Sequence, residues 1–217
     1  MKKSGLKMLA VLVLGSLLFT ATAAADSTFE VTVTNLTKGL VFTPVMVAST
    51  LKGDTFFKLG EAASGELETI AETGDPGPLQ GSLDAFDSTN SGAMLLPGAS
   101  VTQFVATAGP YRSISVAAML IPTNDLFFAV NGVAGPNGNK TIIVTSPAYD
   151  AGTEDNDEDC DSLPGPGCGM DPGPASSGEG YVYIANGIRG IGDLDEDALD
   201  WRNPVALIEI TRLPDDD

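Results

Sequence analysis

The hexapeptide Phe29-Glu30-Val31-Thr32-Val33-Thr34 alternates strictly between apolar and polar side chains. Successive side chains of a β-strand point to opposite faces, so a period of two indicates a strand with one buried and one solvated face. Residues 100–105 and 206–213 repeat the pattern. The three segments predict half-buried strands and favour an all-β fold.

Apolar runs without alternation are typical of strands that are buried more fully. They occur at residues 41–48, 114–121, 126–130, 140–144 and 181–185. Turn-forming residues separate them, for example Gly109-Pro110 and residues 135–139. Only residues 64–72 are expected to be helical, with Ser64 as N-cap and acids in the first turn. About eight strands with one short helix and a long acidic loop predict an antiparallel β-sandwich.

The N-terminal segment predicts export. Three Lys precede an apolar run at residues 8–19, and the small residues 21–25 that follow resemble a signal-peptidase site. The run is short for a membrane span, which needs about 20 residues. We therefore expect a cleaved signal peptide at residues 1–25, a single domain at 26–217 without a transmembrane anchor, and a secreted or periplasmic location.

Composition excludes several classes of function. The chain has 11 Lys and Arg, and loss of residues 1–25 leaves 8 of them against 29 Asp and Glu, a net charge of −21. Such a charge repels nucleic acids, which are not expected as partners. The absence of His excludes Ser-His-Asp and Cys-His catalysis, and we expect no enzyme. A glycoside hydrolase, which needs only two carboxylates, stays as the alternative.

The two cysteines, Cys160 and Cys168, enclose a turn-rich segment. In an oxidising compartment such a close pair is expected to form a disulfide, which would staple the surrounding acidic loop. The gain in stability is modest because the closed loop is short.

The acidic tract at residues 146–159 follows an apolar strand and contains a glycine. Calcium takes six to eight oxygens from carboxylates, carbonyls and water, and a loop of this composition can supply them. The tract opens a turn-rich segment at 148–180, and loops of that length are functional or disordered. The alternative is a solvated acidic loop, with Asp125 forming only a local Asx-turn after Pro122.

Four segments carry a family resemblance, in order along the chain: Phe29-Glu30-Val31-Thr32-Val33-Thr34-Asn35-Leu36-Thr37, Thr123-Asn124-Asp125-Leu126-Phe127-Phe128-Ala129-Val130-Asn131-Gly132, Tyr149-Asp150-Ala151-Gly152-Thr153-Glu154 and Asp200-Trp201-Arg202-Asn203-Pro204-Val205-Ala206. Together they resemble the spondin N-terminal domain, in particular its bacterial stand-alone form. The resemblance implies an eight-stranded β-sandwich with a calcium ion bound by loops at one end.

The ligands that the resemblance implies are Asp125, Asp150 and Glu154, the last departing from the family's Asp. If the strands next to Asp125 and Asp150 are neighbours, the carboxylates converge, and a divalent cation relieves their repulsion. The expected function is a secreted calcium-binding module that binds or adheres to an unknown extracellular or envelope protein or glycan. The alternative is a structural protein in which the ion only stabilises loops.

Two residues near the C-terminus, Trp201 and Arg202, invite a ligand-binding role. A lone Trp before a last strand is more often packed in the core, and Arg202 is expected to pair with Asp200 or Asp195.

Overall fold

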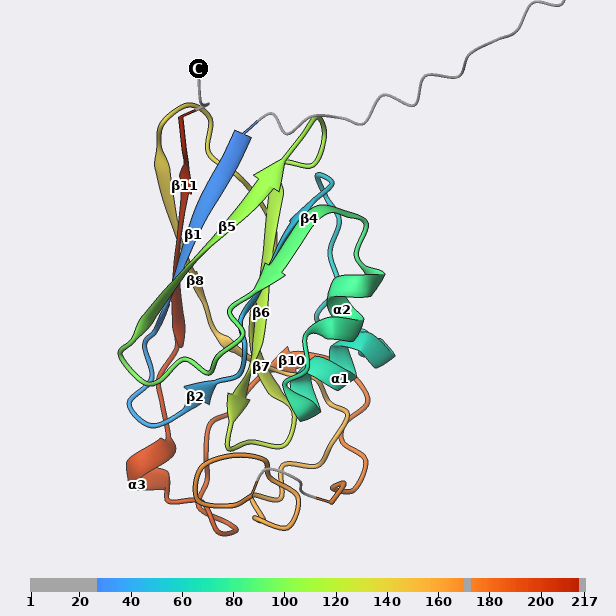
Figure 1. Cartoon of the computed structure of the whole chain (residues 1–217). Helices are drawn as coiled ribbons and strands as arrows, with labels where there is room; N and C mark the ends of the chain where they lie inside the picture. Colours follow the sequence, from blue (N-terminus) through green and yellow to red (C-terminus); the bar gives the residue numbers. More distant parts are fainter. Residues whose placement is uncertain (1–26, 170–172, 215–217) are drawn as a thin grey trace, which may run out of the picture.

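The fold is built from two antiparallel sheets that pack face to face, so the predicted sandwich is confirmed (Figure 1). The computed structural model describes residues 27–169 and 173–214. The predicted signal peptide at residues 1–25 lies outside the described residues. No helix in the described part of the chain is long and apolar enough to cross a membrane.

The smaller sheet is organised around β1 (Ser27–Asn35), the strand that the alternating hexapeptide predicts. Phe29, Val31 and Val33 are fully buried between the sheets, whereas the polar residues between them are half-buried. The strand order is β5-β1-β11-β8. The flanking strands are β5 (Ser100–Thr107), β11 (Ala206–Arg212) and β8 (Thr141–Ser146).

The larger sheet has the strand order β10-β9-β7-β6-β3-β4, and β2 (Val41–Phe42) pairs with β6. Its strands are β3 (Met46–Thr50), β4 (Ala85–Asn90), β6 (Ser113–Ile121), β7 (Leu126–Ala134), β9 (Ala148–Asp150) and β10 (Tyr183–Ile184). Every residue of β6 is buried, as its unbroken apolar run predicts. Both faces are covered because one faces the smaller sheet and the other lies beneath helices.

The covering helices are α1 (Gly65–Thr73) and α2 (Gly77–Ser82), which lie against the outer face of the larger sheet (Figure 1). The Ser64 hydroxyl accepts a hydrogen bond from the Leu67 N–H at 3.2 Å, which confirms the predicted cap. Leu67 and Ile70 are fully buried against the sheet. The sequence did not predict α2, β4 or the short α3 (Glu196–Leu199).

Two strands expected to be buried are not. Ile143 in β8 is 64% exposed, because β8 is an edge strand and none of the described helices or strands covers the outer face of the smaller sheet. At the edge of the larger sheet, β10 has only two residues, and Tyr181 and Ile184 are 45% and 42% exposed. The burial prediction was therefore wrong for residues 140–144 and for part of 181–185.

Long connections gather at one end of the sandwich, the lower end in Figure 1, after β9 and β10. The start of β7 and the end of β9 reach this end together, because the two strands are antiparallel neighbours. Strand ends therefore hold the first residues of the acidic loop.

Candidate functional site

Asp125 and Asp150 are brought together by the pairing of β7 with β9. Leu126, the first residue of β7, lies opposite Asp150, the last residue of β9. Directly beside this pair, the Ala151 N–H donates to the Asp125 carbonyl at 3.2 Å. The two strands are thus neighbours. Convergence of the two carboxylates was predicted on this condition.

The Asp125 side chain is fully buried. Its Oδ2 accepts hydrogen bonds from the backbone N–H groups of Thr153 at 2.7 Å and Glu154 at 3.1 Å, and from the Thr153 hydroxyl at 3.2 Å. Its Oδ1 has no hydrogen-bond partner among the described residues. Because the partners come from the acidic tract, the alternative of a purely local Asx-turn at Asp125 is wrong.

Asp150 is held by its own turn. Its Oδ1 accepts from the Gly152 N–H at 2.8 Å and its Oδ2 from the Asn156 side-chain amide at 2.7 Å. Gly152 has φ +69°, and a Cβ there would stand 2.3 Å from the Tyr181 carbonyl oxygen, so this turn requires glycine. Asp150 is 1% exposed, and the solvated-loop alternative is therefore wrong for the start of the tract.

Burial dominates the electrostatics of this pair. Desolvation, followed by the negative charge of Asp150, raises the pKa of Asp125 from an ordinary 3.8 to about 7, against the opposing hydrogen bonds from Thr153 and Glu154. Desolvation also raises the pKa of Asp150, although hydrogen bonds from Tyr183 and Asn156 oppose the rise. Two neighbouring carboxylates that resist ionisation are a natural place for a cation, which would stabilise their charged forms.

Glu154 is placed differently from the two aspartates. Its backbone N–H contacts Asp125, but its own carboxylate accepts a hydrogen bond from the Ala175 N–H at 3.0 Å. Burial raises its pKa to about 7, with further contributions from the charges of Glu72, Asp157 and Glu68. The structure thus brings Asp125 and Asp150 together and directs the Glu154 carboxylate to Ala175. Across the residues that the structure describes, no group of three or more acidic or cysteine side chains is arranged to hold a metal ion.

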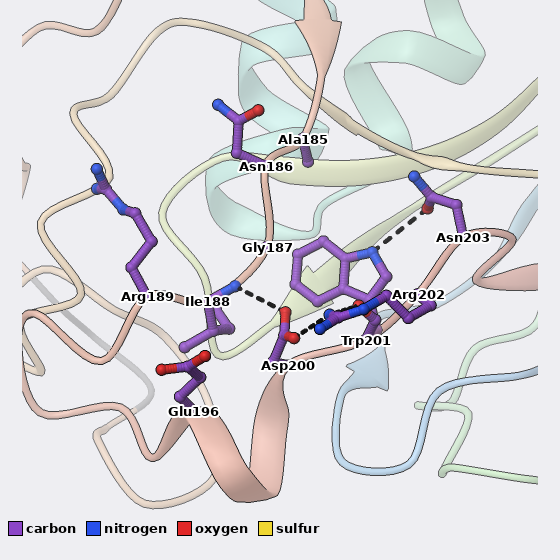
Figure 2. A pocket seen from close by; sticks show the side chains of 10 residues that line it. All are labelled: Ala185, Asn186, Gly187, Ile188, Arg189, Glu196, Asp200, Trp201, Arg202 and Asn203. Carbon is purple, nitrogen blue, oxygen red and sulfur yellow. Dashed lines mark hydrogen bonds and ion pairs between the residues drawn. The ribbon is translucent and has the colours of Figure 1, made fainter.

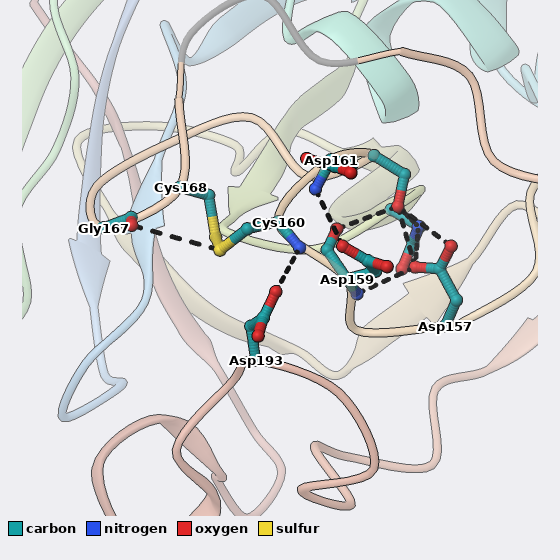
Figure 3. The surroundings of a disulfide bond; sticks show 9 residues. Asp157, Asp159, Cys160, Asp161, Gly167, Cys168 and Asp193 are labelled. Carbon is teal, nitrogen blue, oxygen red and sulfur yellow. Dashed lines mark hydrogen bonds between the residues drawn. A yellow bond between two sulfur atoms is a disulfide. The ribbon is translucent and has the colours of Figure 1, made fainter.

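The predicted Cys160–Cys168 disulfide is present and fits an oxidising compartment (Figure 3). Carboxylates order the loop around the disulfide by accepting hydrogen bonds from backbone N–H groups. Asp193 accepts from the Cys160 N–H at 3.1 Å, and Asp157 accepts from the Asp159 N–H at 3.0 Å. Part of the acidic run therefore serves to fix the loop.

Sequence reasoning missed two residues that link this loop to its surroundings. Asn156 donates to Asp150, and its carbonyl accepts from the Arg189 guanidinium. Glu158 is 3% exposed, and its carboxylate accepts from the Arg189 N–H at 2.7 Å and the Ile191 N–H at 3.0 Å. Nothing in the sequence distinguishes Glu158 from the exposed acids around it.

A pocket of about 550 Å³ lies beside the loop, between residues 185–189 and 196–203 (Figure 2). Trp201 is 7% exposed and belongs to the core, and Arg202 pairs with Asp200, as predicted. Burial alone would raise the pKa of Asp200, but the hydrogen bond and charge of Arg202 outweigh it and hold the pKa below its ordinary value. A glycosidase acid needs the opposite shift, so this carboxylate does not favour the hydrolase alternative.

The sequence matches no protein-family model and no curated protein. The spondin resemblance therefore stays a prediction that rests on the four segments that carry it.

Proposed function

We propose that this protein is an exported calcium-binding β-sandwich module whose role is to bind or adhere to a partner outside the cell or in the envelope. The observation that carries the calcium proposal is the Asp125 Oδ1 atom. It is a carboxylate oxygen, fully buried, next to a second buried carboxylate, and without a hydrogen-bond donor in the described chain. Buried polar atoms normally have partners, so this oxygen is a candidate ligand for a bound cation.

The donor set fits a hard cation. Asp125 and Asp150 supply carboxylate oxygens, and calcium accepts such ligands together with carbonyls and water in flexible geometry. When bound, the ion supplies positive charge that offsets the repulsion of the two carboxylates. The protein residues supply the rest: Thr153 and Glu154 fix the Asp125 carboxylate, and Asn156 fixes that of Asp150.

The binding role is supported by the spondin resemblance and by the lack of enzyme signals. The alternative is a structural protein in which the ion only stabilises loops, and such a protein needs no surface for a partner. A pocket beside the acidic loop favours the binding role.

The test is thermal unfolding of the mature chain after treatment with a chelator, at increasing free calcium. A site present only in the folded state raises the melting temperature, with a stabilisation of about 2.7 kcal/mol at a calcium concentration of 100 times Kd. Asp125→Asn and Asp150→Asn should remove the rise. Glu154→Gln should keep it, because the Glu154 carboxylate is engaged by Ala175.

Asp159→Asn is the matched control. It removes one negative charge from the same loop while its amide oxygen can still accept from the Asp161 N–H, as Asp159 does at 3.0 Å. A melting temperature that changes with neither calcium nor chelator would reject the metal site. Equal loss of the calcium response in Asp159→Asn and Asp125→Asn would assign the effect to general charge instead.

A further inference from the structure

The pocket of about 550 Å³ has a small apolar floor, and most of its accessible lining is polar (Figure 2). Ala185, Ile188 and Trp201 form the floor and are 8%, 6% and 7% exposed. The rim carries amide, guanidinium and carboxylate groups, all of them exposed except the half-buried Asp200. They belong to Asn186, Arg189, Glu196, Asp200, Arg202 and Asn203.

Several rim groups have unused hydrogen-bonding capacity. Asn203 uses its Oδ1 to accept from the Ala148 N–H at 2.9 Å and the Trp201 indole at 3.3 Å, and among the described residues its Nδ2 has no hydrogen-bond acceptor. In the described part of the chain, no hydrogen bond engages the side-chain amide of Asn186 or the carboxylate of Glu196. The rim therefore presents both donors and acceptors to a ligand.

The charge of the rim is balanced. The lining includes two arginines, Arg189 and Arg202, and two acids, Glu196 and Asp200, in a mature chain whose net charge is −21. Arg202 pairs with Asp200, and Arg189 pairs with Glu158. The strongly negative surroundings disfavour an anionic ligand, and the two guanidinium groups disfavour a cationic one. The chemistry points to a neutral molecule with apolar faces and many hydroxyl groups.

We propose that this pocket binds a neutral oligosaccharide. A sugar ring presents C–H faces to an apolar floor, and each hydroxyl both donates and accepts, which matches the mixed rim. The volume lies in the range of small-molecule sites. A neighbouring hollow of about 370 Å³, lined by Leu36, Thr37 and Lys38, shares Asp200, Trp201 and Arg202 with the pocket, which gives room for more than one sugar unit.

This inference rests on the proposed binding role, for which it names the partner class, and not on the calcium site. Glu196 does not line the hollow that surrounds Asp150, so a variant at Glu196 separates the two proposals, whereas Asn186 does line that hollow and its variant needs the calcium-dependent melting shift as a control. Both side chains are exposed, and replacing them should leave the fold intact.

The test is isothermal titration of the calcium-saturated mature chain with neutral oligosaccharides of glucose, galactose, mannose and N-acetylglucosamine. Uronic-acid oligosaccharides and an acidic peptide serve as comparison ligands. We expect a neutral oligosaccharide to bind with Kd below about 1 mM. Asn186→Ala and Glu196→Ala should each weaken binding about fivefold, the effect of losing one hydrogen bond.

Asn139→Ala is the matched control, an exposed asparagine in the turn between β7 and β8, at the far ends of the strands from the pocket. Absence of binding by every neutral oligosaccharide, stronger binding of the acidic ligands, or unchanged affinity in both pocket variants would overturn the proposal. Release of reducing sugar would overturn it in favour of a hydrolase. Loss of saccharide binding with an intact calcium-dependent melting shift would reject this inference alone.

Discussion

Replacing Asp125 by Asn should stabilise the calcium-free protein at alkaline pH while it destroys the proposed calcium site. Asp125 is fully buried, and its pKa rises from 3.8 to about 7 in the folded state. Between pH 3.8 and about 7, Asp125 therefore keeps its proton in the folded protein and loses it in the unfolded chain. Stability that depends on this group is present at low pH and is lost as pH rises toward 7.

The magnitude follows from the rise in pKa. One unit corresponds to about 1.4 kcal/mol, so ionising Asp125 in its buried site destabilises the calcium-free fold by about 4 kcal/mol above pH 7. Asn mimics the neutral acid and its amide oxygen can still accept from the Thr153 N–H. The free energy of unfolding of Asp125→Asn should therefore exceed that of the native protein by about 4 kcal/mol at pH 8. This difference corresponds to a melting temperature higher by roughly 10 °C.

The assay is urea unfolding in chelator at pH 4.5 and pH 8, followed by the fluorescence of Trp201, the single tryptophan. The native free energy of unfolding should fall between the two pH values, and the fall should be smaller in Asp125→Asn. At pH 8 the order should reverse only at free calcium well above about 1,000 times Kd, where calcium stabilises the native protein by more than about 4 kcal/mol. A variant that is no more stable than the native protein at pH 8 in chelator, with an unchanged pH dependence, would refute the electrostatic account.

Three further substitutions test the scaffold. Gly152→Ala should reduce the free energy of unfolding by about 2–4 kcal/mol, because a Cβ would stand 2.3 Å from the Tyr181 carbonyl; Gly138→Ala, also at positive φ but with open space, should lose only about 1 kcal/mol in the same urea titration. Ser64→Ala should lower stability by about 1 kcal/mol through loss of the α1 cap, and an unchanged melting temperature would contradict that role. Replacing Cys160 and Cys168 together by Ser should reduce stability by about 2 kcal/mol, and the native protein in reductant should unfold at the same urea concentration as this variant.

The local sequence pattern was sufficient to predict a strand and its buried face where burial does not depend on a further layer. The alternation around Val31 predicted β1 and its buried face, and the unbroken run of β6 predicted a strand covered on both sides. The same reasoning was wrong for β8, because the run containing Ile143 says nothing about whether a further layer covers that sheet. Burial of an edge strand depends on its neighbours, which a single sequence does not specify.

In the candidate site, too, some features follow from local sequence and others depend on contacts with distant residues. Asp125 and Asp150 each stand at the end of an apolar strand, so the sequence predicted that they meet only if those strands are neighbours, and the pairing of β7 with β9 meets that condition. The direction of the Glu154 carboxylate depends on Ala175, which lies in a later part of the loop. The burial of Glu158 depends on a return of the chain to Arg189, a contact between residues far apart in sequence.

Asn156 contacts both proposed sites, since its amide holds Asp150 and its carbonyl accepts from Arg189 on the pocket rim. One residue thus links a carboxylate at the end of β9 to an arginine that lines the pocket. If both proposed sites bind their ligands, this link would let calcium change the affinity of the pocket, and thermodynamic reciprocity would then require the saccharide to change calcium affinity by the same factor. In an environment of fluctuating calcium, attachment would become a conditional event.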